Sequence, residues 1–168
     1  MIHSYTYKDL KPVLMDSSST KVEDPYYVIT DAEQKIFVVS PGKNGDEFNK
    51  TVGYINTYPG AEVYVCLYGQ GVLIMQRSDV ELGAKEFKVV TLNPGRVIEV
   101  PVGWARCLVN VGKTYLVVLD NLVVEKKYLD SKYILEKKGL VYYIVEKKGE
   151  VGFERNPNYS LYPQITTE

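Results

Sequence analysis

Four polar residues stand in apolar, strand-like segments, and their side chains limit the chemistry that this chain could perform. They are Tyr54, Asn56, Glu62 and Arg106. A glutamate can take up and return a proton as a general base. A guanidinium can stabilise a developing negative charge, as a metal ion does. These residues therefore allow proton transfer assisted by a fixed positive charge.

A metal site is harder to build from the same residues. Arg106 is cationic at any accessible pH and cannot ligate a metal. A neutral tyrosine such as Tyr54 is a poor ligand. Glu62 and Asn56 would supply two oxygen ligands, and the single histidine of the chain, His3, lies near its start, where we expect a mobile terminus. The residues thus predict no metal ion.

Short strand-like runs with turn signals between them dominate from residue 26 onward and would position these side chains. The predicted strands are Tyr26–Thr30, Lys35–Ser40, Thr51–Asn56, Glu62–Tyr68, Val72–Arg77, Lys85–Leu92, Val97–Val100, Ala105–Val109 and Tyr115–Leu119. Many short strands at close spacing are typical of an antiparallel sandwich or jelly-roll barrel. One short helix is expected before residue 25 or around residues 125–131.

The last third of the chain holds three similar charged turns, at residues 125–127, 136–139 and 146–149. We interpret them as solvated hairpin tips rather than as an internal repeat. The runs between and after them are expected to be further strands, at Ser131–Leu135, Leu140–Val145 and Glu150–Glu154. Residues 159–168 show no pattern and are expected to be loosely ordered.

Composition places the chain among ordinary globular proteins. Its 168 residues suffice for one domain with a sizeable core, and 45% are apolar and 24% charged. The net charge of −1 gives no reason to expect nucleic-acid or membrane binding. No apolar run reaches the roughly 20 residues that span a bilayer, and the start lacks a secretory signal, so we expect a cytoplasmic protein. Fifteen tyrosines beside one histidine and three methionines fit a thermophile.

The two cysteines, Cys66 and Cys107, are not expected to form a disulfide. Alternation along a strand points Cys66 to the same side as Glu62. If Arg106 faces the interior of a barrel, Cys107 faces outward, so the two thiols would lie on opposite sides of the sheet wall. Both are expected to be free, buried thiols.

Several motifs in a fixed order resemble the archaeal, cupin-type glucose-6-phosphate isomerases. The matching stretches include Ala61-Glu62-Val63-Tyr64, the turn Gly69-Gln70-Gly71, Pro94-Gly95, Trp104-Ala105 and Asn156-Pro157-Asn158-Tyr159. The resemblance covers about residues 24–159. It implies an all-β cupin jelly roll (a double-stranded β-helix barrel) with extra terminal strands. It also implies a homodimer, because a partner commonly covers the exposed edge strands of such a barrel.

The resemblance also implies where a metal would have been held. The family carries Gly-His-x-His where this chain has Gly53-Tyr54-Ile55-Asn56, and Trp-Ala-His where it has Trp104-Ala105-Arg106. Of the four family ligands only the glutamate remains, as Glu62. Tyr54, Asn56, Glu62 and Arg106 are therefore the positions of a degenerate metal site.

Because Arg106 and Glu62 stand at positions that shared one ion, their side chains are expected to converge within salt-bridge distance. Arg106 could then polarise a sugar carbonyl while Glu62 moves a proton between adjacent carbons. Alternatively, the two groups merely neutralise each other, since a buried carboxylate that loses its metal needs another positive charge. Both readings stay open on the sequence.

The resemblance further implies a phosphate site made by Thr51, the backbone at Gly53 and the Tyr64 hydroxyl, with a looser match at Tyr128. Small donors and backbone amides suit an anion. Threonine and tyrosine are also ordinary strand residues, so composition alone explains them.

Taken together, the sequence predicts one cupin domain over residues 1–168, with a core at about 24–125, additional strands at 126–159 and a loose tail at 160–168. The predicted function is a glucose-6-phosphate isomerase-like protein that binds a sugar phosphate, with weak or lost isomerase activity and no cofactor. The alternative is a non-catalytic, metal-free cupin that binds a small molecule or acts in regulation.

Overall fold

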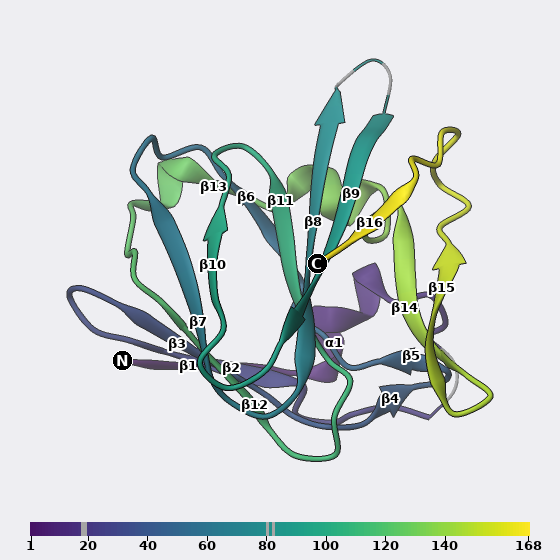
Figure 1. Cartoon of the computed structure of the whole chain (residues 1–168), viewed down its shortest axis with the longest axis horizontal. Helices are drawn as coiled ribbons and strands as arrows, with labels where there is room; N and C mark the ends of the chain where they lie inside the picture. Colours follow the sequence, from purple (N-terminus) through teal and green to yellow (C-terminus); the bar gives the residue numbers. More distant parts are fainter. Residues whose placement is uncertain (18–19, 80, 82) are drawn as a thin grey trace.

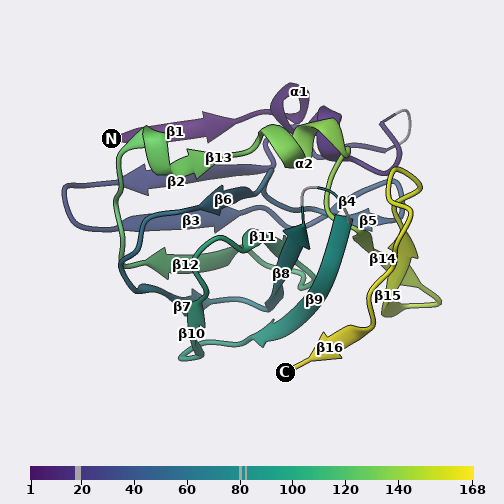
Figure 2. The same ribbon diagram turned by 90° about the horizontal axis from the view of Figure 1, so that it is seen from above.

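Two six-stranded sheets face each other and close a barrel, and a smaller third sheet lies beside it (Figures 1 and 2). This computed structural model describes residues 1–17, 20–79, 81 and 83–168. The strand order confirms the predicted all-β cupin jelly roll.

The first sheet is antiparallel throughout and forms one wall of the barrel. Its strands, in spatial order, are β1 (Ile2–Tyr5), β2 (Tyr26–Thr30), β3 (Lys35–Val39), β12 (Leu116–Asp120), β7 (Glu62–Tyr68) and β10 (Val97–Val100). The second sheet forms the facing wall. Its strands are β13 (Leu129–Asp130), β6 (Tyr54–Asn56), β11 (Ala105–Asn110), β8 (Gly71–Asp79), β9 (Gly83–Leu92) and β16 (Ile165–Thr167).

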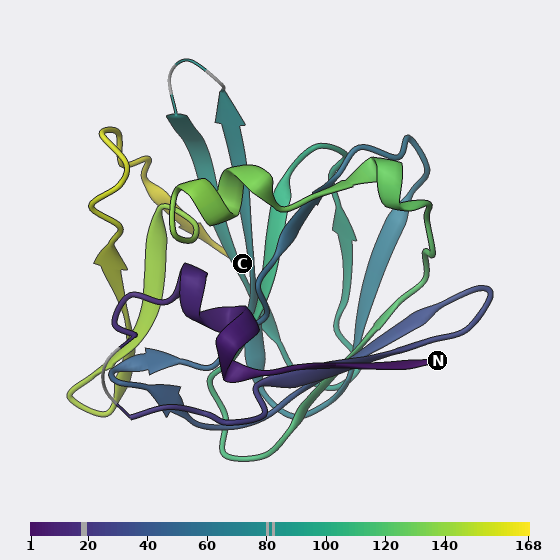
Figure 3. The same cartoon turned by 180° about the vertical axis from the view of Figure 1, so that it is seen from behind.

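The third sheet, α1 (Tyr7–Leu10), η1 (Lys11–Val13) and α2 (Lys132–Glu136) pack on the outer side of the second sheet, as Figure 3 shows for the two α-helices. The third sheet contains β15 (Glu150–Arg155), β14 (Tyr142–Lys147), β5 (Glu47–Phe48) and β4 (Lys43–Asn44). A further helical element, η2 (Lys126–Tyr128), lies just before β13. In the described part of the chain no helix is long and apolar enough to cross a membrane.

Two apolar cores follow from this layering. One fills the barrel interior and includes Tyr64, Cys66 and Leu108, and the other lies between the second sheet and the elements outside it and includes Cys107 and Ile134. The alternation of buried and half-buried residues along β7 is what two-faced strands require. Cys66 and Cys107 lie on opposite sides of the barrel wall and are both free, as predicted.

Strands β2, β7 and β10 begin and end at the predicted residues, but the prediction of a strand over Ser131–Leu135 is wrong. That run forms helix α2. Before the helix, the Asp130 carboxylate accepts a hydrogen bond from the amide of Lys132, the first helical residue, at 2.8 Å, which forms a turn around the N-cap residue Ser131. Lys138 and Gly139, with φ of 57° and 115°, end it. The aromatic and β-branched residues of this run favour a strand, but the local hydrogen bonds at its two ends outweigh that preference and the run folds as a helix.

Three further expectations about the ends and turns are corrected. His3 does not lie in a mobile terminus, because it belongs to β1 and pairs with Val28 of β2. The tail is ordered, because β16 runs parallel to β9 along its edge. Of the three charged turns, the one at 146–149 joins β14 and β15 as a hairpin, whereas 125–127 leads into η2 and 136–139 ends α2.

Candidate functional site

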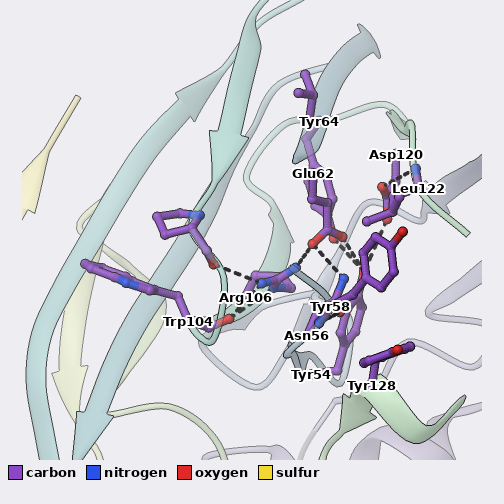
Figure 4. A network of polar contacts seen from close by, with 12 residues as sticks. Tyr54, Asn56, Tyr58, Glu62, Tyr64, Trp104, Arg106, Asp120, Leu122 and Tyr128 are labelled. Atoms are coloured by element: carbon purple, nitrogen blue, oxygen red, sulfur yellow. Dashed lines mark hydrogen bonds and ion pairs between the residues drawn. The ribbon is translucent and has the colours of Figure 1, made fainter. Parts of the chain in front are cut away.

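A buried polar cluster occupies the barrel interior, and its side chains come from strands of both six-stranded sheets (Figure 4). Tyr54 and Asn56 share one face of β6, because they are two residues apart on the strand. Arg106 lies opposite Tyr54 in the pairing of β11 with β6. Glu62 begins β7 and points the same way as Tyr64. The sequence positions predicted to converge are therefore brought together.

Arg106 and Glu62 form a buried ion pair in this cluster. The guanidinium Nη1 of Arg106 contacts Glu62 Oε2, and the two side chains are 1% and 4% exposed. The other guanidinium nitrogens donate to backbone carbonyls: Nη2 to Trp104 O at 2.9 Å and to Pro101 O at 3.4 Å, and Nε to Trp104 O at 3.2 Å. The predicted salt bridge is confirmed, and every nitrogen of the guanidinium has an acceptor.

The carboxylate of Glu62 is equally occupied. Its Oε2 accepts a second hydrogen bond from Asn56 Nδ2 at 3.1 Å. Its Oε1 accepts one from the Tyr54 hydroxyl at 3.3 Å. Both oxygens are thus engaged by neighbouring side chains, which stabilises the carboxylate inside the barrel.

Lys35 and Asp120 form a second ion pair that the sequence analysis missed. Lys35 Nζ lies 3.2 Å from Asp120 Oδ2, and the two residues are direct partners in the pairing of β3 with β12. Asp120 also accepts a hydrogen bond from the Leu122 amide at 2.9 Å. Alternation along the two predicted strands could have found them, because Lys35 shares a face with buried Phe37, and Asp120 shares one with buried Val118.

The pKa of Asp120 is raised from 3.8 to about 7. Burial is the largest cause, and the charge of Glu62 and a hydrogen bond with it add to the effect, while Lys35 and the Leu122 amide act in the opposite direction. Asp120 is therefore a carboxyl group that can hold a proton near neutral pH. In this respect it differs from an exposed aspartate.

Tyr54 connects the two ion pairs. Its hydroxyl lies 2.8 Å from the Tyr64 hydroxyl and 3.3 Å from Asp120 Oδ2, in addition to its bond to Glu62. Burial raises the pKa of both phenols well above the usual value, so both remain neutral. Two cations lie near the Tyr54 ring, with the Arg106 guanidinium carbon and Lys35 Nζ each 5.2 Å from its centroid.

A cavity of about 280 Å³ lies beside this cluster, and Tyr54 lines it too. Four of its ten lining residues are aromatic, and the lining residues are Tyr5, Asp9, Tyr26, Phe37, Thr51, Val52, Gly53, Tyr54, Ser131 and Leu135. Glu62, Arg106 and Asp120 are not among them. A ligand in this cavity, which we call the aromatic pocket, would contact Tyr54 before it could reach Glu62.

The four residues expected to bind substrate are not all in one place. Thr51 and Gly53 line the aromatic pocket, but the Thr51 hydroxyl is already used, because it accepts a hydrogen bond from the Leu108 amide at 3.1 Å. Tyr64 lies in the polar cluster, and Tyr128 packs edge-on against Tyr58, with ring centroids 5.1 Å apart. The structure thus joins two of the four residues at the pocket.

The charge of the aromatic pocket is negative. Asp9 is the charged residue among those that line it. Hydrogen bonds from the backbone amide and the side chain of Thr6 lower the pKa of Asp9, so the carboxylate is ionised at neutral pH. A phosphate dianion bound here would face this carboxylate.

Comparison with known proteins decides the family. The chain matches the family described as Glucose-6-phosphate isomerase (GPI) over residues 5–162. This chain belongs to the glucose-6-phosphate isomerase family. The residues that carried the resemblance therefore reflect descent.

Among the relatives of the isomerase family, the enzyme named glucose-6-phosphate isomerase from Pyrococcus abyssi is 30% identical over 166 residues, covering 90% of this chain and 84% of the relative. The one from Pyrococcus furiosus is 33% identical over 123 residues, covering 73% of this chain and 61% of the relative. The one from Thermococcus litoralis is 31% identical over 125 residues, covering 74% of this chain and 62% of the relative. The chain thus spans about three fifths of the length of two of these relatives.

Solved structures with a similar arrangement are distant. An oxalate oxidase in complex with glycolate is 20% identical, covers 52% of this chain and 40% of that one, and has a TM-score of 0.40. The capsular polysaccharide assembling protein CapF from Staphylococcus aureus is 16% identical, with a match that covers 66% of this chain and 32% of that one and has a TM-score of 0.48. We base no functional argument on either.

The side chains at the family's metal positions do not fit a divalent ion in this isomerase-family chain. Among the described residues, no group of three or more histidine, cysteine, aspartate or glutamate side chains could hold one. The guanidinium of Arg106 contacts the carboxylate that would have to ligate, and Tyr54 stays protonated. His3 is not part of this cluster, because it is exposed and lies in β1, where it pairs with Val28 of β2.

Proposed function

We propose that this protein is a sugar-phosphate-binding member of the glucose-6-phosphate isomerase family whose isomerase activity is weak or lost. It needs no metal cofactor in this role. The observation that carries the proposal is that both carboxylate oxygens of Glu62 already have partners. Arg106 and Asn56 bind one oxygen, and the Tyr54 hydroxyl binds the other.

Isomerisation of an aldose to a ketose requires a base that takes a proton from one carbon and returns it to its neighbour. For Glu62 to do so, it would have to give up one of its hydrogen bonds and reach past the Tyr54 ring. Arg106 could stabilise the enediolate, but its charge is already partly neutralised by Glu62. The geometry therefore supports binding in the aromatic pocket better than it supports turnover.

The aromatic pocket suits the ring of a sugar. Tyr5, Tyr26, Phe37 and Tyr54 offer apolar faces, and Tyr5 and Tyr26 stack on each other with centroids 4.2 Å apart. Gly53 also lines the pocket, and its carbonyl accepts a hydrogen bond from the hydroxyl of Ser131, another lining residue, at 2.8 Å. We place the sugar phosphate here.

A second candidate function is a non-catalytic cupin that binds an uncharged small molecule or acts in regulation. The observation that favours it is Asp9, since the charge it brings to the pocket opposes a phosphate. Calorimetric titration of untagged protein with glucose 6-phosphate, fructose 6-phosphate and glucose separates the two. Binding of the phosphorylated sugars supports the first function, and binding of glucose alone supports the second.

Two matched variants test whether the aromatic pocket is the binding site. Leu135 lines the pocket and is 42% exposed, and Val151 is 43% exposed on β15 and does not line it. We expect Leu135→Trp to weaken sugar-phosphate binding at least about tenfold, because an indole would fill the pocket, and Val151→Trp to leave it unchanged. Equal binding by both variants would place the ligand elsewhere.

Restoring the family's ligands tests the reason given for the lost activity. The triple variant Tyr54→His, Asn56→His, Arg106→His recreates three histidines beside Glu62, a set that suits a divalent metal. We expect the variant to bind a stoichiometric divalent ion and to gain isomerase activity. A variant that folds and binds metal but shows no gain would mean that the barrel has lost more than its metal ligands.

A further inference from the structure

A second cavity, separate from the aromatic pocket, lies between the N-terminal helical segment and the end of helix α2. Its volume is about 410 Å³, and the residues that line it include Lys8, Lys11, Leu14, Met15 and Lys138. Among the described residues, none lines both this cavity and the aromatic pocket. The volume lies within the range of roughly 300–1,000 Å³ that is common for small-molecule sites.

This cavity, which we call the lysine pocket, carries positive charge alone. Lys8, Lys11 and Lys138 are all exposed, and the described residues that line the pocket include no aspartate or glutamate. Within the described part of the chain, none of these three lysines forms an ion pair, although the chain has a net charge of −1. A cavity lined by one sign of charge raises the local concentration of the opposite ion, so the lysine pocket favours an anion.

The helical segment α1–η1 sorts its charges between the two pockets. Lys8 and Lys11 are three residues apart on this segment, a spacing that places both on one side of a helix. Asp9 stands between them in sequence and lines the aromatic pocket instead. An anion is therefore attracted to the lysine pocket, whereas Asp9 opposes it in the aromatic pocket.

A buried ion pair holds the N-terminal wall of the lysine pocket in place. Lys50 Nζ lies 2.7 Å from Glu47 Oε2 and donates a hydrogen bond to the Val13 carbonyl at 2.6 Å. The Oε1 atom of Glu47 accepts a hydrogen bond from the Met15 amide at 2.9 Å. The side chains of Lys50 and Glu47 are 7% and 1% exposed. These bonds fix the backbone on either side of Leu14, so the apolar part of the wall is built before any ligand binds.

The end of α2 brings Lys138 against this wall. A Cβ atom on the next residue, Gly139, would lie 3.2 Å from the Val13 carbonyl oxygen, so the two backbones are in close contact. Figures 2 and 3 show α1 and α2 side by side. The Lys138 carbonyl also accepts a hydrogen bond from the Tyr143 hydroxyl at 2.7 Å. The third lysine is thus held beside the other two by contacts between segments far apart in sequence.

We propose that the lysine pocket binds a molecule that carries two or more neighbouring phosphate groups. A single phosphate monoester has a charge of about −1.5 to −2 at pH 7, so three lysines match a longer phosphate chain better. Lysine binds phosphate as a point charge and needs no fixed planar geometry. Pro12, Leu14 and Met15 offer an apolar surface to the rest of such a molecule. The proposal does not depend on the proposed function, because the described residues of the lysine pocket belong neither to the aromatic pocket nor to the polar cluster.

Calorimetric titration of untagged, full-length protein with inorganic triphosphate and with orthophosphate tests the proposal. We expect a Kd for triphosphate below about 1 mM at low salt, and binding of orthophosphate at least about tenfold weaker. The triple variant Lys8→Gln, Lys11→Gln, Lys138→Asn should bind triphosphate at least about 20-fold more weakly. Lys138 has a φ of 57°, a backbone conformation that asparagine tolerates, so the variant should keep the wild-type circular dichroism.

The matched control is the triple variant Lys85→Gln, Lys113→Gln, Lys148→Asn, which removes the same charge from exposed lysines outside the lysine pocket. Lys148 has a φ of 53°, so the control also matches the backbone position of Lys138. We expect the control to bind triphosphate within about twofold of wild type. Equal weakening in both triple variants would show a general charge effect and would overturn the proposal, as would wild type that binds no triphosphate at 1 mM.

Two further ligands identify the source of the phosphates. Adenosine triphosphate supplies them on a soluble molecule, and phosphatidylcholine vesicles with phosphatidylinositol 4,5-bisphosphate supply them on a lipid headgroup. Binding of either ligand that the pocket variant loses and the control keeps supports the site and names its source. Binding of both ligands that is unchanged in the pocket variant would place the phosphates elsewhere and overturn the proposal.

Discussion

Removing Arg106 should destabilise the fold far more than most single substitutions do. Arg106→Ala leaves Glu62, whose side chain is 4% exposed, without its positive partner. Breaking a buried ion pair in this way typically costs about 3–5 kcal/mol. Asn56 and Tyr54 still donate to the carboxylate, but the carbonyls of Trp104 and Pro101 lose their donor. We therefore expect a loss of about 3–5 kcal/mol, a large part of the roughly 5–15 kcal/mol that stabilises a domain.

Urea unfolding followed by circular dichroism measures this loss. With a slope of about 2 kcal/mol/M, a loss of about 4 kcal/mol lowers the midpoint by about 2 M. A double-mutant cycle with Glu62→Gln isolates the pair from the packing of the arginine. We expect the double variant to be more stable than the sum of the two single losses predicts, by about 1–3 kcal/mol.

Two results would refute this reasoning. If Arg106→Ala changed stability by less than about 1 kcal/mol, the pair would behave as an exposed salt bridge, which contributes at most about that much. If the two single losses were simply additive, Arg106 and Glu62 would not be energetically coupled. Either result would remove the basis for treating Arg106 as the replacement for a metal charge.

Three further predictions concern single side chains. Between pH 4 and 7 the folded state keeps a proton on Asp120 that the unfolded state releases, because its folded pKa is about 7 rather than 3.8, so stability should fall as pH rises through this window. Asp120→Asn should flatten that slope in urea titrations, and an unchanged slope would contradict the assignment. Asp9→Asn should strengthen glucose 6-phosphate binding about two- to fivefold and leave glucose binding unchanged, as measured by calorimetry at low salt. An equal effect on both sugars would show that repulsion of phosphate is not the cause. Gly53→Ala should lower stability by about 2 kcal/mol or more, since φ is +87° and the new Cβ would lie 2.7 Å from the Arg106 carbonyl oxygen. A wild-type melting temperature would count against that strain.

The strands of the barrel could be predicted from the sequence because each carries its own signal. Strands β7 and β10 alternate in burial and end at clear turns, so their bounds were found. Helix α2 could not be found in this way, because its five residues bury Ile134 alone and give no helical period. Strand β16 depends on hydrogen bonds to β9, which no local pattern reveals.

The candidate site was predictable only where a resemblance named positions. Glu62 and Arg106 were placed together because both stand at family ligand positions. Lys35 and Asp120 stand at no such position, and their contact comes from the pairing of β3 with β12, two strands far apart in sequence. The aromatic pocket could not be predicted either, because Tyr5 and Asp9 come from an N-terminal segment in which no pattern indicates a place beside the barrel.

The turnover of untagged wild-type protein with glucose 6-phosphate, in the presence of a chelator, tests the central claim most directly. That claim is that the buried Arg106–Glu62 pair occupies the position of the family's metal and leaves no free base. Loss of a single oxyanion donor lowers rates of other enzymes by about 10²–10³, and loss of a metal should lower them at least as much. We predict turnover below about 0.1 per second. Chelator-insensitive turnover at about 1–10³ per second, the usual range for enzymes, would contradict the account and would make Arg106 a working substitute for the metal.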